Sequence, residues 1–266
     1  MTCTRTITTL NAGFTQAQLS AALQTAFANA GFSSLFDSFT SGTDLCLVYA
    51  FTTDATKTYG ITYIRIRITT GFVIYQQPYG SWNTSTHTGT GTGTGTEINY
   101  GTLVNTVNVI FNSLTNGNEA RLVCVNQGST FLLLGAITPS ILRGSWDLNS
   151  YTASFIPNTN TLTSIIGTIF NQYYSISTST SMINTLLGAG SALLAGANIV
   201  DLQRDILTGV PLLNNTNGGF LGQLSSDFAI CASNGSTRYD VIVPTGTSQQ
   251  YLVIVPGSGG IAVRIN

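Results

Sequence analysis

The residues that could support catalysis or metal binding are few in this chain. His87 is the only histidine, so one chain cannot supply a multi-histidine metal site, and the H-E-x-x-H pattern is absent. His87 lies in SWNTSTHTGTGTGTGT at 81–96, a run of low complexity that predicts a solvated loop rather than a positioned base. The glycines of this run lack the G-K-[ST] ending of a phosphate-binding loop. We therefore expect no cofactor and no metal; the alternative is a homotrimer that gathers three copies of His87 around its axis, each giving one metal ligand.

The ten carboxylates offer two candidate acid–base pairs for a hydrolase. Asp201 and Asp205 are four residues apart, which is typical of a solvated helix end. Asp227 and Asp240 could approach each other across a hairpin, but Asp is also common in turns and at strand ends. We assign neither pair a catalytic role, and we expect a protein that is not an enzyme.

A second group of residues could recognise a partner. Arg65 and Arg67 alternate with Tyr63 on one strand-like face, where a carboxylate or a glycan could dock. Trp82 and Trp146 lie beside turns, and flat aromatic rings stack on sugars. The sequence thus gives Trp82, Trp146, Arg65 and Arg67 as candidate glycan or partner contacts. For the two arginines, the alternatives are a solvent-exposed face or an ion pair between subunits.

The clearest structural element is a helix near the N-terminus. Thr15 is a candidate N-cap with Gln18 three residues on, which is a capping box, and Phe14 and Leu19 match a hydrophobic staple. Gly31 marks the C-terminal end. Apolar residues recur between them at helical spacing: Leu19, Ala22, Leu23, Ala26, Phe27 and Ala30.

Together with this helix, residues 1–156 are predicted to form an α+β domain. Predicted strands cover 44–52, 63–68, 72–76, 121–126 and 130–137, and a second helix is predicted over 102–114, with Leu103, Val107, Ile110, Phe111 and Leu114 on one face. The order helix, strands, helix, strands suggests a pseudo-repeat, closed by GSWN at 80–83 and GSWD at 144–147.

Residues 157–222 are predicted to be a helical segment that forms a central hairpin. Apolar residues between Ile165 and Tyr174 are helix-spaced, and a longer helix is expected over 182–207. Its heptad-like seam predicts a helix between subunits: Leu186, Gly190, Leu193, Ala197 and Val200. A membrane span is not expected, because Asn and Ser interrupt the apolar run.

Residues 223–266 read as a small antiparallel sheet of four short runs at 228–232, 239–243, 251–255 and 261–265. Asn234-Gly235 between the first two is a strong hairpin signal. The predicted fold class is therefore α+β: mainly antiparallel β, with a capped N-terminal helix, a central helical hairpin and a C-terminal sheet.

Charge is scarce throughout the chain. Charged residues make up 7%, Lys57 is the only lysine and 41 residues are threonine, yet 43% are apolar. Surfaces near neutrality favour association, so we expect a homo-oligomer, and nine scattered basic residues do not suit nucleic-acid binding.

The four cysteines are predicted to be buried free thiols, with a Cys46–Cys124 disulfide as the alternative. Residues 1–5 lack a signal-peptide pattern.

The opening TRTITTLNAGFTQAQLSAALQTAFANAGF and the Thr/Ser/Asn/Gly-rich, lysine-poor texture resemble virion structural proteins of tailed bacteriophages, above all cyanophages. The resemblance implies a non-enzymatic virion subunit, assembled in the host cytoplasm with other virion proteins. Tail, baseplate and fibre-attachment proteins are most similar. A capsid decoration protein and a host-surface glycan-binding tail-tip module are the alternatives.

Overall fold

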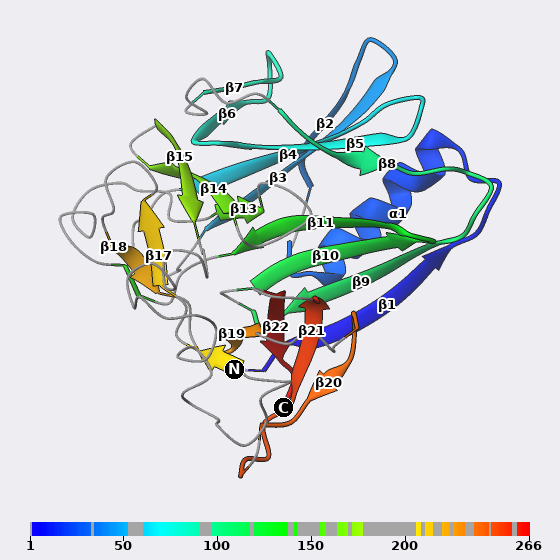
Figure 1. The fold of residues 1–266 in the computed structure, drawn as a ribbon. Coiled ribbons are helices and arrows are strands. Elements are labelled where there is room, and N and C mark those ends of the chain that lie inside the picture. Colours follow the sequence, from blue (N-terminus) through cyan, green and yellow to red (C-terminus); the bar gives the residue numbers. More distant parts are fainter. Residues whose placement is uncertain are drawn as a thin grey trace.

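The computed structural model shows a β-rich protein with one helix, α1, in its described part (Figure 1). The expectation of antiparallel β structure is confirmed, and the expected α+β balance is wrong. The residues described are 2–32, 35–52, 61–90, 97–117, 120–137, 141–142, 155–157, 164–169, 172–177, 206–208, 211–214, 220–223, 226–231, 237–244, 246–256 and 260–266.

The predicted N-terminal helix is confirmed as α1 (Gln16–Asn29). The Thr15 hydroxyl accepts a hydrogen bond from the Gln18 amide, and the Gln18 side chain accepts one from the Thr15 amide at 2.8 Å, which completes the capping box. Phe14 and Leu19 are both buried. Gly31 follows the helix at φ +90°, the left-handed conformation that commonly ends a helix.

The five-stranded sheet contains the predicted meander. Its order is β2-β3-β4-β5-β8, all neighbours antiparallel. The alternation in YIRIRI decides which face is buried, because Ile64, Ile66 and Ile68 are fully buried while Arg65 and Arg67 point the other way. The strands are β2 (Leu35–Ser41), β3 (Asp44–Thr52), β4 (Ile61–Ile68), β5 (Val73–Tyr79) and β8 (Ile98–Thr102).

A ten-stranded sheet forms the second layer, in the order β1-β9-β10-β11-β13-β14-β15-β17-β18-β12. The strands predicted over 121–126 and 130–137 are confirmed as its hairpin β10–β11. The strands are β1 (Thr4–Leu10), β9 (Val109–Thr115), β10 (Ala120–Gln127), β11 (Thr130–Ile137), β12 (Ile141–Leu142), β13 (Phe155–Pro157), β14 (Ser164–Ile169), β15 (Gln172–Ser177), β17 (Pro211–Asn214) and β18 (Phe220–Gln223).

The main core lies between these two sheets, with α1 packed between them on one side. Leu19, Leu23 and Phe27 of α1 share a cluster with inward-facing residues of β3, β4, β9, β10 and β11. The sheets meet directly where the buried side chain of Gln76 in β5 binds both the amide and the carbonyl of Gly135 in β11. The core thus fixes the orientation of the five-stranded sheet and leaves its other face outward.

The predicted C-terminal sheet is confirmed, in the order β16-β19-β22-β21-β20, although not as a simple meander. The strands flanking Asn234-Gly235 do not pair with each other, so the hairpin expected there is wrong: β19 instead pairs with β16 and β22. The strands are β16 (Ile206–Thr208), β19 (Phe228–Cys231), β20 (Val241–Ile242), β21 (Tyr251–Val255) and β22 (Gly260–Arg264).

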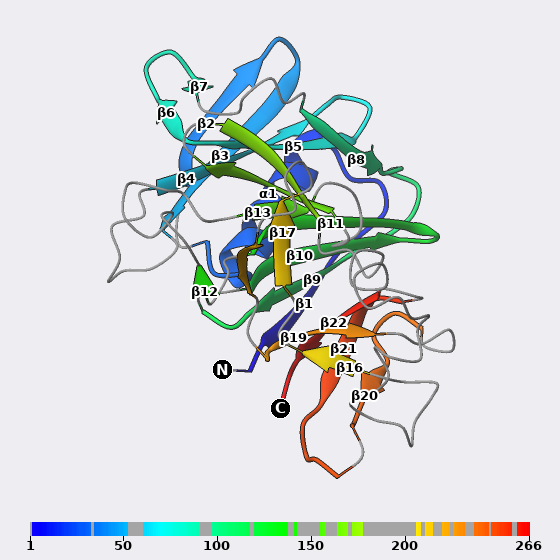
Figure 2. The same ribbon diagram turned by 60° about the vertical axis from the view of Figure 1, so that its left-hand side comes forward.

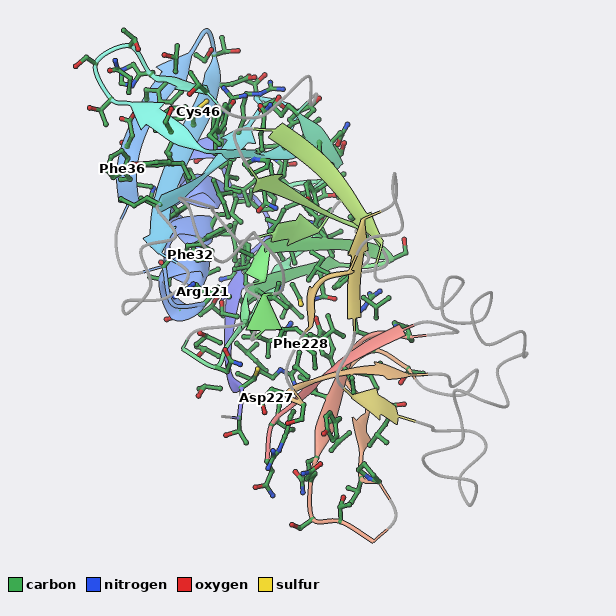
Figure 3. The ribbon with its side chains drawn as sticks, turned by 90° about the vertical axis from the view of Figure 1, so that its left-hand side faces the viewer. Phe32, Phe36, Cys46, Arg121, Asp227 and Phe228 are labelled. Carbon is green, nitrogen blue, oxygen red and sulfur yellow. The ribbon has the colours of Figure 1, made fainter. Side chains whose placement is uncertain are left out.

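Polar contacts join the C-terminal sheet to the start of the chain, and the two termini lie close together (Figure 2). The Cys3 amide donates to the Arg264 carbonyl at 2.7 Å, and the Asn126 side chain donates to the Tyr239 hydroxyl at 2.5 Å. Figure 3 shows Asp227 in this region, and Phe36 and Cys46 near the opposite end of the molecule.

The helix predicted over 102–114 is wrong: this segment forms the end of β8, a loop and β9. Its many Val, Thr and Asn residues are poor helix formers. The Gln127 side chain also satisfies the loop backbone, because it donates to the carbonyls of Val104 and Val107 at 2.6 and 2.7 Å. Without this second helix, the order helix, strands, helix, strands that suggests a pseudo-repeat is not present.

The predicted central helical hairpin is also wrong where the structure describes it. The described residues of the helix-spaced run between Ile165 and Tyr174 form the antiparallel strands β14 and β15, which pair from Ser164–Ser177 to Ile169–Gln172. β-branched and aromatic residues favour a pleated strand over a helix. Of the helix predicted over 182–207, residues 182–205 lie outside the described residues, and 206–208 form β16.

Cys46 and Cys124 are buried free thiols, as expected, so the alternative disulfide between them is not formed, and Cys3 is buried as well. Burial raises the pKa of Cys46 to about 11 and that of Cys124 to about 12, so both are protonated at neutral pH. In the part of the chain that the structure describes, no helix is long and apolar enough to cross a membrane.

Candidate functional site

The outward face of the sheet β2-β3-β4-β5-β8 gathers three of the four candidate glycan or partner contacts, Arg65, Arg67 and Trp82, and we call it the outer face. Strand register builds it: Phe39 of β2 pairs with Cys46 of β3, Cys46 pairs with Arg67 of β4, and Arg67 pairs with Tyr75 of β5. One row further along, Asp37, Val48, Arg65 and Gln77 are aligned in the same way. Residues from four strands far apart in sequence therefore share one surface.

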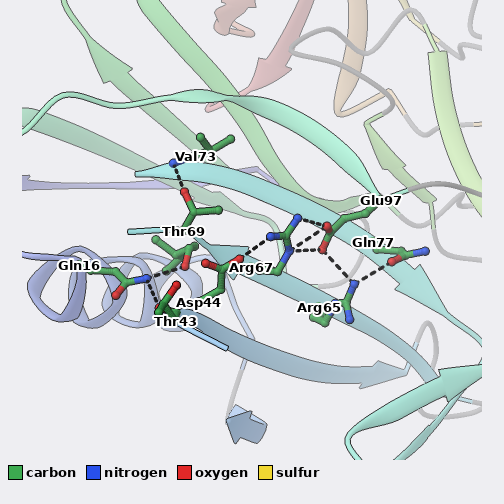
Figure 4. Close-up of polar contacts among 10 residues, drawn as sticks. Gln16, Thr43, Asp44, Arg65, Arg67, Thr69, Val73, Gln77 and Glu97 are labelled. Atoms are coloured by element: carbon green, nitrogen blue, oxygen red, sulfur yellow. Dashed lines mark hydrogen bonds and ion pairs between the residues drawn. The ribbon is translucent and has the colours of Figure 1, made fainter. Parts of the chain in front are cut away.

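An ion-pair network occupies the end of the outer face nearest β8 (Figure 4). Glu97 accepts from Arg65 at 2.9 Å and from the Arg67 guanidinium through both of its oxygens, while Arg67 also pairs with Asp44 at 2.5 Å. Arg65 donates in addition to Gln77. All four charged side chains are partly buried, with exposed fractions of 15–23%.

This network assigns the two predicted arginines to partners inside the chain. Hydrogen bonds from Arg67 to Glu97 and Asp44 raise the pKa of its guanidinium despite the opposing effect of burial. The Arg67 guanidinium also lies 4.0 Å from the centre of the Tyr75 ring. The sequence allows an ion pair between subunits here, whereas the structure shows an ion pair within one chain.

A second cluster lies at the other end of the outer face, where a two-stranded hairpin, β6 (Ser81–Asn83) and β7 (Thr88–Thr90), stands beside β2. One carboxylate oxygen of Asp37 accepts hydrogen bonds from Trp82 Nε1 at 2.8 Å and from His87 Nδ1 at 2.9 Å. The Asp37 side chain is only 8% exposed, whereas that of His87 is 41% exposed. Asp37 thus fixes the side chains of Trp82 and His87 through hydrogen bonds to both rings.

His87 is held more firmly than its sequence context predicts. Its ring stacks on Phe39 with centres 4.4 Å apart and planes 15° apart. Its backbone has φ +52°, in the left-handed region that few side chains adopt. His87 is exposed, as expected, but the expectation that it is unpositioned is wrong, because a largely buried carboxylate 50 positions away in sequence orients the ring.

Burial alone would raise the pKa of Asp37, but the hydrogen bonds from His87 and Trp82 and the charge of His87 together lower it below its ordinary value. Asp37 is accordingly ionised at neutral pH and can only accept hydrogen bonds. Because an ionised carboxylate only accepts, His87 donates to it through Nδ1.

Aromatic rings extend from this cluster across the outer face. Trp82 contacts Tyr79 edge-on at 5.0 Å and Phe39 at 6.1 Å. Tyr79 is the cross-strand neighbour of Tyr63, which contacts Phe36 edge-on at 5.0 Å. We call these six residues the aromatic row: Phe36, Tyr63, Tyr79, Trp82, Phe39 and His87.

Gly89 allows the hairpin to lie against this row. A Cβ atom at position 89 would come within 2.1 Å of the Tyr79 ring and 2.8 Å of the Trp82 ring. The threonine–glycine repeat, which the sequence predicts to be a flexible loop, thus has a structural use at 88–90, where it forms β7.

The remaining predicted site residues are not brought to the outer face. Asp227 pairs with Arg264 at 3.9 Å, and Asp240 accepts from Thr237, so each has its own partner in the C-terminal part. Trp146, Asp201 and Asp205 lie outside the described residues, as do the five residues of the predicted inter-subunit seam: Leu186, Gly190, Leu193, Ala197 and Val200.

Sequence reasoning missed Asp37, Phe39 and Tyr79. Asp37 is the only carboxylate in its strand, and the alternation of β2 is the one local signal that it shares a face with Phe39. Nothing local indicates that both meet Trp82 and His87.

Within the described residues, no group of histidine, cysteine and carboxylate side chains could hold a metal ion. Comparison of the chain with protein-family models, with curated proteins and with solved structures gives no match.

Proposed function

We propose that this chain is a non-enzymatic structural subunit of a phage virion, of the tail, baseplate or fibre-attachment type, that assembles through surfaces of low charge. The phage assignment rests on the resemblance of the N-terminal sequence. The observation that supports an assembly role is how the few charges are used.

Every carboxylate whose side chain is described accepts a hydrogen bond or ion pair from its own chain. The partners of Asp37, Asp44, Glu97 and Asp227 are given above, and Asp240 binds Thr237. The described arginines likewise donate within the chain: Arg5, Arg65, Arg67, Arg121, Arg238 and Arg264. The outward surface of the described part is therefore dominated by hydroxyl, amide and apolar groups, as at the centre of a protein interface.

A first candidate contact is the edge strand β1 with the neighbouring strand β9. Ile7 and Ile110 lie on the same side of this pair and are 55% and 43% exposed. β1 carries a single charge, that of Arg5, and lies at the end of the ten-stranded order. An edge strand with so little charge is suited to pairing with a second copy.

Sedimentation velocity over a range of protein and salt concentrations tests this proposal. Contacts between uncharged surfaces are hardly screened, so we expect an oligomer that persists at high salt. Ile7→Lys should shift it towards monomer, whereas Thr70→Lys, in the exposed turn between β4 and β5, should not. A monomer at every concentration would refute the assembly role, and immunogold labelling of particles would test the virion assignment.

A further inference from the structure

The aromatic row exposes ring surface that packing of the core does not use, and one of its rings, that of His87, is held in place by Asp37. All of these rings lie on the face turned away from the core. Phe36 is 42% exposed there, and Tyr63, Phe39 and Trp82 are partly exposed. A sheet face in water normally carries polar residues. Rings that persist there point to a ligand that stacks on them.

The position of His87 strengthens this reading. The turn between β6 and β7 ends in a left-handed residue, for which glycine is the least strained choice. The chain instead places its only histidine there, orients it through the largely buried Asp37 carboxylate, and leaves 41% of its side chain exposed. A fixed hydrogen-bonding ring beside flat aromatic rings matches a sugar, whose hydroxyls both donate and accept and whose C–H face stacks.

The charges of the outer face select among sugars. Its two arginines, Arg65 and Arg67, are neutralised by Glu97 and Asp44, and the Asp37 carboxylate beside the row is bonded to His87. No described arginine or lysine of the outer face is left to bind a carboxylate or sulfate group. Acidic sugars would therefore lack an arginine or lysine partner, which neutral sugars do not need.

We propose that the aromatic row binds a neutral oligosaccharide, with Trp82 and Phe36 offering ring faces to sugar units and the exposed His87 ring forming a hydrogen bond with a sugar hydroxyl. The row contains two separately exposed ring groups, Phe36–Tyr63 and Trp82–Phe39–His87, joined by the more buried Tyr79. It therefore suits a chain of sugars better than a single one. The proposal is independent of the assembly role.

Tryptophan fluorescence gives a direct test, because the chain has only two tryptophans. In a Trp146→Phe background, Trp82 is the sole emitter. Titration with oligosaccharides of dextran and of mannan should shift its emission saturably, while oligogalacturonate, in which every sugar unit carries a carboxylate, should not.

Two variants separate recognition from folding. His87→Gly removes the ring but suits the left-handed backbone, so we expect retained stability and about tenfold weaker binding, equivalent to ~1.4 kcal/mol. Phe36→Ala should weaken binding of long chains more than of short ones. Tyr75→Leu is the control, because Tyr75 is an aromatic residue of the same face outside the row.

Three results would overturn the proposal. They are no response to either neutral glycan, equal binding of the acidic polymer, and unchanged affinity in both row variants when circular dichroism shows that they are folded. Loss of the oligomer in the same variants, without any sugar binding, would identify the row as a protein contact instead.

Discussion

Gly135→Ala should destabilise this protein severely, because two independent costs coincide at this position. Gly135 has φ +104° in the middle of β11, and a Cβ atom there would lie 2.1 Å from the Arg121 carbonyl oxygen of the neighbouring strand. The backbone of a paired strand cannot move aside as a side-chain tip can. The Gln76 side chain also binds both polar groups of this residue, with its Oε1 2.8 Å from the amide nitrogen.

The magnitude follows from these two costs. A left-handed backbone with a Cβ costs about 1–2 kcal/mol, and inserting a methyl group into packed surroundings costs about 1–3 kcal/mol. The sum is ~2–5 kcal/mol of unfolding free energy. At about 2 °C per kcal/mol for a chain of this size, the melting temperature should fall by ~4–10 °C.

Gly117→Ala is the matched control, since Gly117 has φ +87° but no atom lies within 4 Å of the place that a Cβ atom would occupy. It should incur the backbone cost alone. Urea denaturation followed by circular dichroism would measure both variants. If Gly135→Ala loses no more stability than Gly117→Ala, the argument that the Arg121 carbonyl blocks a side chain here is refuted.

Three further predictions concern the outer face. Gly89→Ala should displace the hairpin from Tyr79, seen as a red-shifted tryptophan emission, and an unchanged spectrum would contradict the close packing. Glu97→Gln should cost ~1–3 kcal/mol in urea denaturation, between the values for exposed and buried ion pairs, and the loss should shrink little in high salt. Because the pKa of Asp37 is below its ordinary 3.8, its stabilising effect is complete above that value and is lost as the pH falls through the lowered pKa; the stability difference from Asp37→Asn should shrink only below about pH 4.

Features that depend on contacts within a few residues can be predicted from this sequence, and features that depend on distant contacts cannot. The capping box at Thr15 and Gln18 and the alternation around Arg65 are readable because their partners lie within a few residues. The helix predicted over 102–114 is wrong because apolar spacing alone fits a helix there, while the Gln127 side chain that fixes the loop lies 20 or more positions away. Between Ile165 and Tyr174 the spacing also fits a helix, although β-branched residues favour the strands that form.

The candidate site shows the same division more sharply. The sequence singles out Trp82, Arg65 and Arg67 by residue type, and it gives the shared face of Arg65 and Arg67 by period alone. It does not indicate that Glu97 neutralises both arginines or that Asp37 binds Trp82 and His87, because each contact joins strands whose neighbours only the sheet register sets.

By itself, the sequence determined the scarcity of charge, the capped helix and the alternating strands, since composition, capping and period are properties of short stretches of chain. Only the tertiary structure decided where the few charges are used and that the lone histidine has a fixed orientation. Pairing of β2, β3, β4 and β5 brings residues from four separate strands onto one face, and the hairpin β6–β7 closes over its end. A surface assembled across strands in this way has no counterpart in any local pattern.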